Sequence, residues 1–416
     1  MTRELDLNKI EENLLLAIKE NLHSFDSYYI VDLIKLKNEV DFFVSTFDYK
    51  NDIFSYSYKT NYVKTIVNYL DKRDFLSELV SPFEVDISKE FKINPAKIIY
   101  NGPLKDSNSI SYVLNSGGIV NIDNIEEFEL IKNLIDTNKL RNFNRIGLRI
   151  SFENKNLSSR FGIVYNSNDY FYIVDELINN QKILFESLHI HYPQRDIDSF
   201  KKRLQKIMGA AQEIKLINKD FVSIDIGGGF PSRMPKSIAD SIGIEKVSSI
   251  TEFSKIILEM RLKYNLEDLK FIYEPGTAIA ANSMKIVGNI KSINNKNNKI
   301  YLNTDLSKGL MGGLRNNVNY PFSIINKSKE IFEDKENFYF ISGFTCVEGD
   351  ILGSFKTNRN INVGDLLIFD SVGSYSSVFK SPFIRGDIPI FSWDGKNLEL
   401  CRRSQTAKDL CDLYLS

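Results

Sequence analysis

Cysteine is scarce in this chain of 416 residues. Only Cys346, Cys401 and Cys411 are present, an odd number that is too small for a disulfide framework. Small secreted domains depend on such frameworks, whereas proteins in reducing compartments keep their few thiols free. We therefore expect a cytoplasmic protein.

Long apolar runs are absent as well. No stretch of about 18 apolar residues occurs, so the sequence predicts no membrane-spanning helix. The N-terminal segment carries acidic groups throughout, which is not the pattern of a signal peptide. Its apolar residues recur at helical spacing and predict an amphipathic surface helix. They are Ile10, Leu14, Ala17, Ile18 and Leu22.

A large net charge of either sign is also missing. The chain has 53 basic and 54 acidic side chains. Because no general field attracts nucleic acid or an anionic membrane surface, we expect neither as a partner. The expected partner is a small molecule.

Short β-prone runs alternate with longer helical stretches from residue 50 to about residue 280, which is typical of β-α units around a parallel sheet. Eight strands are predicted, the number of a (β/α)8 TIM barrel, and we assign this barrel to residues 36–284. An open doubly wound sheet is the competing arrangement. The predicted strands are Ile53–Ser57, Phe83–Ile87, Ile98–Tyr100, Ile119–Ile122, Ile146–Ile150, Ser187–Ile190, Ser223–Ile226 and Phe271–Tyr273, and predicted helices include Asn61–Leu70, Ile125–Ile135 and Ser199–Ile217.

Residues 285–416 have a different pattern. Short β-prone runs at Ile300–Asn303, Phe338–Ile341 and Leu366–Phe369 are separated by clusters of Gly, Asn and Lys. This pattern predicts a second, mainly antiparallel β domain. Residues 1–35 are expected to join it, because Tyr28–Val31 reads as one more strand.

Polar residues follow several predicted barrel strands. Lys59 follows the first strand, His189 and His191 end the sixth, the glycines 227–229 follow the seventh, and Glu274 follows the eighth. The C-terminal strand ends of a barrel share one rim, which carries the active site. We expect these residues to converge there.

Lys59 and the glycines Gly227, Gly228 and Gly229 indicate a carbonyl cofactor that carries a phosphate. A lysine whose pKa is lowered by burial forms Schiff bases, although a loop lysine is more often a solvated charge. Three glycines leave backbone N–H groups bare for a phosphate, although an ordinary tight turn has the same composition. The position after the seventh barrel strand favours the phosphate.

His189 and His191 are two of only three histidines in the chain. Residues two apart in a strand face the same side, so both rings are able to point toward the barrel mouth. A zinc pair is one interpretation, but no third His or Cys ligand lies in the barrel, and we expect no metal. Stacking of an imidazole on a flat cofactor is the favoured interpretation, and a buried structural histidine is the plain alternative.

Glu274 precedes a Pro-Gly turn that would fix the direction of its side chain. A carboxylate beside a pyridinium nitrogen keeps that nitrogen protonated, and a protonated ring is a strong electron sink. A carboxylate that binds only the N–H groups of the turn is the alternative.

Together these motifs resemble the ornithine/diaminopimelate decarboxylase family, which are pyridoxal-5′-phosphate (PLP) enzymes with a barrel like that of alanine racemase. SYSYKTN is similar to the Y-A-V-K-A-N segment, HIH to H-x-H-x-G-S, DIGGGFP to the phosphate-binding turn, and EPG to the segment of the ring-nitrogen glutamate. The resemblance covers nearly the whole chain. It implies PLP as cofactor, Lys59 as the Schiff-base lysine, His191 as the stacking histidine and Glu274 as the partner of the ring nitrogen.

Other segments resemble the family in the same order. GLRISF implicates Arg149 in cofactor binding, and GDLLIFDSVGSYSSVF places Tyr375 near the phosphate. FTCVEGDIL resembles the C-x-x-x-D-x-L element and implicates Cys346 and Asp350. In the family this element enters the active site of the partner subunit, so the resemblance implies a homodimer with shared sites. Cys346 and His191 are then predicted to be catalytic together with the lysine.

Three residues depart from the family pattern. Gln194 replaces a serine that holds phosphate, Thr277 replaces an arginine that binds phosphate or substrate, and Val347 replaces an acidic residue that meets the distal amine of the substrate. An apolar side chain cannot replace a charge-assisted hydrogen bond of roughly 1.5–3 kcal/mol. We therefore assign substrate binding to the neighbouring Glu348 and to Asp350.

The predicted function is a PLP-dependent decarboxylase that releases carbon dioxide and an amine from an amino acid or an amino-acid conjugate. The departures indicate a substrate other than free ornithine or diaminopimelate. A racemase is the first rival, although Glu274 opposes it, because an alanine-racemase-like site would have an arginine at the ring nitrogen. A catalytically inactive regulatory homologue is the second rival, suggested by Gln194 and Thr277.

Overall fold

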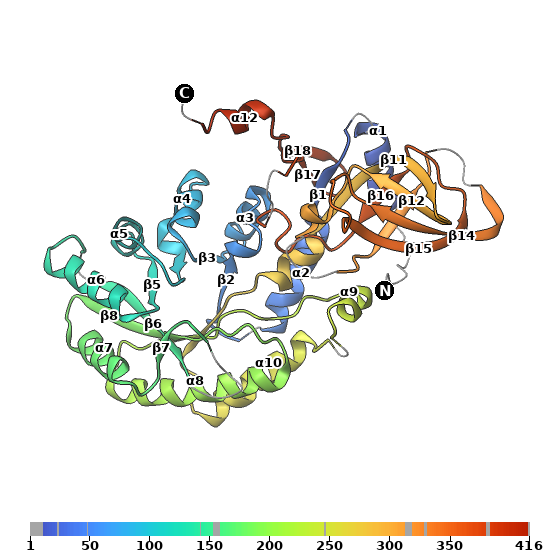
Figure 1. Ribbon diagram of the computed structural model, residues 1–416. Helices are drawn as coiled ribbons and strands as arrows, with labels where there is room; N and C mark the ends of the chain where they lie inside the picture. Colours follow the sequence, from blue (N-terminus) through green and yellow to red (C-terminus); the bar gives the residue numbers. More distant parts are fainter. Residues whose placement is uncertain are drawn as a thin grey trace.

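The computed structural model describes residues 11–414 except 23–24, 48, 142, 153–158, 245–246, 313–317, 328–330 and 380–382. These residues form a closed parallel barrel surrounded by helices, with a mainly antiparallel β domain beside it (Figure 1). The predicted fold class is confirmed. Ile10 of the predicted N-terminal helix lies outside the described residues.

Eight strands of a nine-stranded sheet close into the barrel ring, and every pairing is parallel. Their residues are mostly buried, because side chains fill the interior and helices cover the outside. The ring strands are β2 (Ile53–Ser57), β3 (Leu76–Leu79), β4 (Ile98–Tyr100), β5 (Ile119–Ile122), β6 (Asn144–Ser151), β8 (Ile183–His189), β9 (Ser223–Asp225) and β10 (Lys270–Tyr273), and β7 (Ile163–Val164) pairs with β6 outside the ring.

Helices follow most of the barrel strands and lie on the outside of the ring (Figure 1). Many begin at an Asp, Asn or Ser whose side chain accepts a hydrogen bond from the first helical turn. No helix among the described residues is long and apolar enough to cross a membrane. The longer helices are α2 (Leu33–Thr46), α3 (Lys64–Asp71), α4 (Pro82–Glu90), α5 (Ser107–Asn115), α6 (Ile125–Asp136), α7 (Asn168–Asn179), α8 (Ile197–Ile217) and α10 (Ile250–Lys263), and the short ones are η1 (Tyr58–Thr60), η2 (Pro95–Lys97), α9 (Lys236–Ser241), α11 (Thr277–Ala280) and η3 (Ala281–Ser283).

The predicted strand Phe83–Ile87 is wrong, because this segment belongs to helix α4. Pro82 stands at the start of the helix, and the side chain of the N-cap residue Ser81 accepts a hydrogen bond from the backbone of Glu84. The alternating apolar residues that suggested a strand leave Phe83 66% exposed on the helix surface. The missing barrel strand is β3, whose sequence LSEL has too few apolar residues to stand out.

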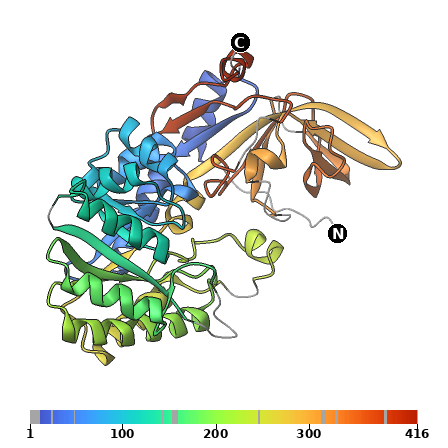
Figure 2. The same cartoon turned by 60° about the vertical axis from the view of Figure 1, so that its left-hand side comes forward.

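The β domain combines the C-terminal part of the chain with its N-terminal segment. The predicted strand at Tyr28–Val31 is confirmed, because β1 pairs with β11 and β17 (Figure 2). All other pairings in this domain are antiparallel, apart from the parallel β12–β14 pair. Its elements are α1 (Glu12–Asn21), β1 (Tyr28–Asp32), β11 (Met284–Lys296), β12 (Lys299–Thr304), η4 (Lys308–Met311), β13 (Phe322–Ile325), β14 (Phe332–Ser342), β15 (Ile351–Arg359), β16 (Leu366–Phe369), β17 (Ile390–Trp393), β18 (Leu398–Arg402) and α12 (Ala407–Cys411).

Asn61 ties the β domain to the barrel mouth. Its buried side-chain amide donates to the carbonyl oxygen of Gly373 at 2.8 Å, and its Oδ1 accepts from Ser377 Oγ at 3.0 Å. The backbone N–H of Tyr375 donates to the carbonyl oxygen of Thr60 at 2.8 Å. These bonds hold one β-domain loop beside the first barrel strand.

The contact at Gly373 leaves no room for a side chain, since a Cβ atom there would lie 1.7 Å from the carbonyl oxygen of Ala280. We expect Gly373→Ala to lower the free energy of unfolding by about 3 kcal/mol or more, measured by urea denaturation. Gly209→Ala in α8 is the matched control, because its Cβ would meet nothing within 4 Å, and alanine favours a helix by about 0.5–1 kcal/mol. Equal stability of the two variants would contradict the tight contact.

Candidate active site

A cavity of about 450 Å³ opens at the C-terminal ends of the barrel strands. A second cavity of about 420 Å³ adjoins it and extends toward the glycine turn after β9. The structure therefore brings the predicted strand-end residues together on one rim. Lys59, His191 and Glu274 line both cavities, His189 and Arg149 line the first, and Gly228, Gly229 and Tyr375 line the second.

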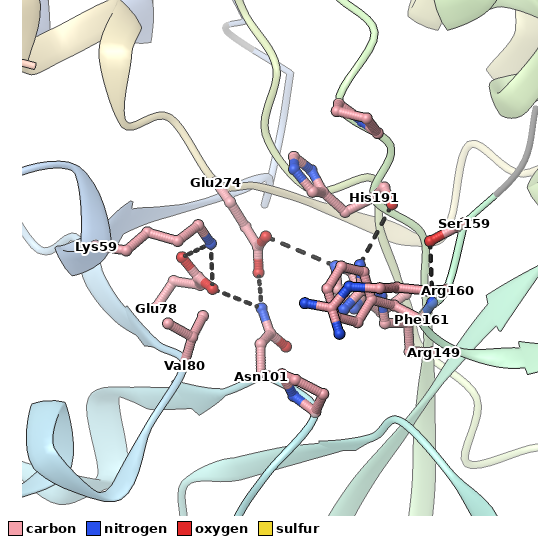
Figure 3. A pocket seen from close by; sticks show the side chains of 14 residues that line it. Lys59, Glu78, Val80, Asn101, Arg149, Ser159, Arg160, Phe161, His191 and Glu274 are labelled. Atoms are coloured by element: carbon pink, nitrogen blue, oxygen red, sulfur yellow. Dashed lines mark hydrogen bonds and ion pairs between the residues drawn. The ribbon is translucent and has the colours of Figure 1, made fainter. Parts of the chain in front are cut away.

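Lys59 lies in the turn η1 directly after β2. Its ammonium group donates to both carboxylate oxygens of Glu78, at 2.9 and 2.8 Å (Figure 3). Burial alone would lower the pKa of Lys59, but the charges of Glu78 and Glu274 outweigh burial and raise it. In the chain by itself, burial therefore does not lower the pKa of Lys59. Glu78 holds Lys59 as a cation at the cavity wall.

Glu78 comes from β3 and is fully buried. Besides the lysine, it accepts hydrogen bonds from Ser57 Oγ at one oxygen and from Asn101 Nδ2, at 3.1 Å, at the other. Each carboxylate oxygen thus accepts two hydrogen bonds, which is its full capacity. Glu78 is consequently a fixed anion with no oxygen lone pair left for a ligand.

Glu274 directly follows β10 and is also buried. Its Oε1 accepts from Asn101 Nδ2 at 2.6 Å (Figure 3). Its Oε2 lies 3.7 Å from Nε2 of His189. Burial would raise the pKa of Glu274, but His189 and Lys59 outweigh burial and hold that pKa well below its usual value. Glu274 is therefore a carboxylate anion that points into the cavity.

His191 presents a neutral ring between the two cavities. Its Nδ1 accepts a hydrogen bond from the backbone N–H of Gly228 at 3.1 Å, so the ring proton sits on Nε2. Burial, together with the charges of Lys59 and Arg203, holds the pKa of His191 well below its usual value. A flat, uncharged imidazole suits stacking against an aromatic ring.

The glycine turn after β9 is shaped by the groups behind it. Gly227 has a φ of +67°, and its N–H donates to Asp225 Oδ1 at 2.9 Å. A Cβ atom on Gly228 would lie 2.7 Å from the carbonyl oxygen of Glu274. Among the described residues, none accepts a hydrogen bond from the amide of Gly229 or Phe230, which both line the second cavity. Such bare amides suit an anion, so the residues present fit a phosphate group.

His189, Asp225 and Glu274 form a buried cluster whose potential ligand atoms lie within 4.8 Å of one another. The sequence offers no third His or Cys ligand in the barrel, and in the structure two carboxylates supply the remaining groups. However, Asn101 directs an amide hydrogen at Glu274, and burial together with the charge of Glu274 raises the pKa of Asp225 well above its usual value. A carboxyl group that keeps its proton is a poor metal ligand.

Arg149 and Arg160 bring two guanidinium groups to the first cavity. Arg149 donates to Asp123 at 2.8 Å and to the carbonyl oxygen of His191 at 3.4 Å, so it supports the loop that carries this histidine. Arg160 stacks on the ring of Phe161, at 4.0 Å from the ring centroid. The contact predicted between Arg149 and the cofactor stays a prediction.

The predicted residues Cys346, Glu348 and Asp350 do not lie at the barrel rim of their own chain. They line a separate hollow of about 640 Å³ on the β domain. Cys346 and Glu348 are exposed, whereas Asp350 is buried and accepts hydrogen bonds from Thr345 Oγ1 at 2.6 Å and from the backbone N–H of Lys308 at 2.9 Å. Within one chain, Asp350 therefore shapes the loop that presents the other two residues.

Sequence reasoning missed Glu78, Asn101 and Asp225. Glu78 was hidden because β3 was not recognised as a strand. Asn101 directly follows β4, and Asp225 ends β9. Both positions obey the same strand-end rule that selected Lys59, so the rule could have found them.

The chemistry that this rim suits is the covalent capture of a flat, phosphate-bearing aldehyde by Lys59. That chemistry defines a class of barrel enzymes in which a lysine holds the cofactor at the strand ends. Comparisons with known proteins narrow the class further.

The family model described as pyridoxal-dependent decarboxylase, pyridoxal binding domain, matches residues 35–281. A probable ornithine decarboxylase of Dictyostelium discoideum is 24% identical over 344 residues, which cover 79% of this chain and 71% of that protein. A diaminopimelate decarboxylase of Methanocaldococcus jannaschii is 22% identical over 380 residues, covering 87% and 83%. The crystal structure of the M. jannaschii diaminopimelate decarboxylase has a TM-score of 0.81 at 20% identity, covering 98% of this chain and 97% of that one.

The chain therefore belongs to the pyridoxal-dependent decarboxylases. Its cofactor is PLP, and its reaction class is that of a carboxy-lyase. The predicted family, cofactor and reaction class are confirmed.

Glu84 is a residue near the site whose protonation makes the stability of the fold depend on pH. It is buried in the first turn of α4, and its Oε2 accepts from the backbone N–H of Val80 at 2.7 Å. Burial and the charge of Glu78 raise the pKa of Glu84 to about 7. An unfolded glutamate titrates near 4.3, so the folded state binds this proton more tightly, and stability falls as pH rises from about 4 to about 7.

We expect Glu84→Gln to remove that loss. Between pH 5 and pH 8 the unmodified chain should lose roughly 2–3 kcal/mol of unfolding free energy that the variant keeps, measured by denaturant titration at each pH. Glu90→Gln, an exposed position at the end of the same helix, is the control and should follow the unmodified chain. Parallel pH profiles for all three proteins would contradict the raised pKa.

Proposed function

We propose that the chain decarboxylates an amino acid or amino-acid conjugate other than free ornithine or diaminopimelate, with Lys59 as the residue that binds the cofactor carbonyl. The observation that carries this proposal is the joining of Lys59 to Glu274 through Glu78 and Asn101. The lysine and the carboxylate thereby stand on one rim in fixed positions.

PLP, when bound, supplies the electron sink for cleavage of the bond to the carboxyl group. Glu274, held ionised in a buried position, would keep a proton on the ring nitrogen, because the ion pair favours both charges. His191 would stack its neutral ring against the flat cofactor. Lys59 would hold the carbonyl carbon of the cofactor through Nζ and would exchange there with the substrate and product amines. Strong ring protonation by Glu274 supports decarboxylation over racemisation.

Cys346 is the proposed proton donor to the carbon that loses the carboxyl group, aided by His191. Because Cys346 is exposed on the β domain and away from the cavity of its own chain, this role requires the loop to enter the site of a partner subunit. We therefore propose a homodimer with shared active sites. Glu348 in the same loop would then face the substrate, and Asp350 would hold the loop in shape.

The substrate assignment rests on the cavity walls. The first cavity holds only two acidic side chains among its described lining residues, Glu78 and Glu274. Glu78 has no oxygen lone pair left for a ligand, and Glu274 would bind the ring nitrogen. Phe161 and Arg160 line the opposite side, which suits an apolar or anionic group better than an ammonium group.

We also propose that the protein is located in the cytoplasm, which is a reducing compartment. All three cysteines, Cys346, Cys401 and Cys411, are exposed and unpaired. Exposed thiols that persist in this form suit a compartment that keeps them reduced.

The central test is replacement of the cofactor lysine. Lys59→Ala should lose borohydride-dependent attachment of PLP and about 10³-fold or more of carbon dioxide release. Lys64→Ala, an exposed lysine one helix later, should keep both. Peptide mass spectrometry reads the attachment, and carbon dioxide release is screened across free diamino acids and their conjugates. Attachment of PLP to another lysine would refute the role of Lys59, and a preference for free ornithine or diaminopimelate would refute the substrate class.

Shared sites predict complementation between inactive variants. Lys59→Ala and Cys346→Ala homodimers, mixed and reassembled, should recover about a quarter of the parental activity, because half of the random dimers are heterodimers with one intact site in two. Lys59→Ala mixed with His191→Ala is the control, since both residues come from the same subunit and no intact site forms. Absence of recovery in the first mixture would exclude the shared site.

A further inference from the structure

We propose that Arg195 is the cation that binds the phosphate group of the cofactor in this chain. This inference rests on the proposed function and concerns the second cavity. That cavity is lined by Gly228 and Gly229 on one side, by Gly276 and Thr277 on another, and by Tyr375 from the β domain.

Arg195 belongs to the loop that follows β8, and its side chain reaches across the cavity. Its Nη2 donates to Thr277 Oγ1 at 3.4 Å, although Thr277 lies 82 residues further along the chain. Arg195 also lines the cavity itself, beside the glycine turn. Its guanidinium group therefore stands where the two loops that carry the bare amides and Thr277 face each other.

The charges around this cavity indicate that Arg195 is the cation that binds the phosphate. Lys59 is the other cation among the described lining residues. Its ammonium group pairs with Glu78, and in the proposed function it binds the carbonyl end of the cofactor. His191 is neutral, as its lowered pKa requires. A phosphate carries close to two negative charges, and burying it without a cation is costly. A guanidinium group matches phosphate geometry through two parallel N–H bonds.

Arg203 of α8 holds the backbone of the loop that carries Arg195. Arg203 is fully buried and donates to the carbonyl oxygens of Tyr192 at 2.9 Å and of Gly228 at 3.0 Å. One side chain thus clamps both the loop after β8 and the glycine turn. Arg203 does not line the cavity, so it positions the anion site without contacting the phosphate.

The test separates the phosphate from the rest of the cofactor by comparing PLP with pyridoxal, which has no phosphate. The full chain, freed of cofactor by dialysis, is titrated with each compound, and binding is read from the absorbance of the lysine-bound form. Arg195→Ala should weaken PLP binding about 10- to 100-fold, as expected for the loss of a charge-assisted bond, and leave pyridoxal binding unchanged. Arg195→Lys should weaken PLP binding less, because it keeps the charge but not the paired geometry.

Two further variants complete the design. Lys236→Ala removes a positive charge from the neighbouring helix α9, where its side chain is 87% exposed, and should bind PLP like the parent. Arg195→Ala combined with Thr277→Arg should regain PLP affinity, because position 277 adjoins the same guanidinium position. Recovery of PLP affinity in this double variant would also exclude misfolding as the cause of the weaker PLP binding of Arg195→Ala.

The outcomes separate this inference from the proposed function. Equal loss of PLP and pyridoxal binding in Arg195→Ala, or unchanged PLP binding, would overturn the role of Arg195 alone. Failure of the parent chain to form any lysine-bound absorbance with PLP would overturn the proposed function as well.

Discussion

The ion pair between Lys59 and the buried carboxylate of Glu78 is the constraint on which the rest of the site depends. Four adjacent strands position it: Glu78 lies in β3, whereas Lys59, Asn101 and Glu274 directly follow β2, β4 and β10, and β10 lies on the other side of β2. The single amide group of Asn101 donates one hydrogen to each carboxylate. Without that amide, two buried anions would face one cation, and like charges at this distance cannot both remain ionised cheaply.

The opposite half of the rim has a different task. Strands β8 and β9 contribute His191 and the glycine turn, and the loop between β8 and α8 contributes Arg195. In the proposed function, polar atoms there would face the phosphate and the flat ring, whereas those of the first half would face the carbonyl and the ring nitrogen. The β domain completes this half through Tyr375, whose position depends on the contact of Asn61 with Gly373.

Strand-end reasoning from the sequence located the fold class and most of the rim. Lys59, His191 and Glu274 stood out because each follows a clear apolar run. Glu78 did not stand out, because its strand LSEL is short and half polar, and the apolar alternation of the following helix drew the assignment to residues 83–87. Arg195 was missed for another reason. Its neighbour Thr277 is distant in sequence, and only the closed ring of strands brings the two loops together.

The distribution of protons between the buried carboxyl groups of Asp225 and Glu274 explains why Glu274 is available to the cofactor. Glu274 and Asp225 lie close together in a region without bulk water, so the pair favours one proton over none. The pKa of Asp225 is raised by burial and by Glu274, whereas the pKa of Glu274 is lowered by His189 and Lys59. The proton therefore resides on Asp225, which also anchors the glycine turn through the N–H of Gly227. The same arrangement that shapes the anion cradle leaves Glu274 as the one carboxylate of the pair that carries a charge.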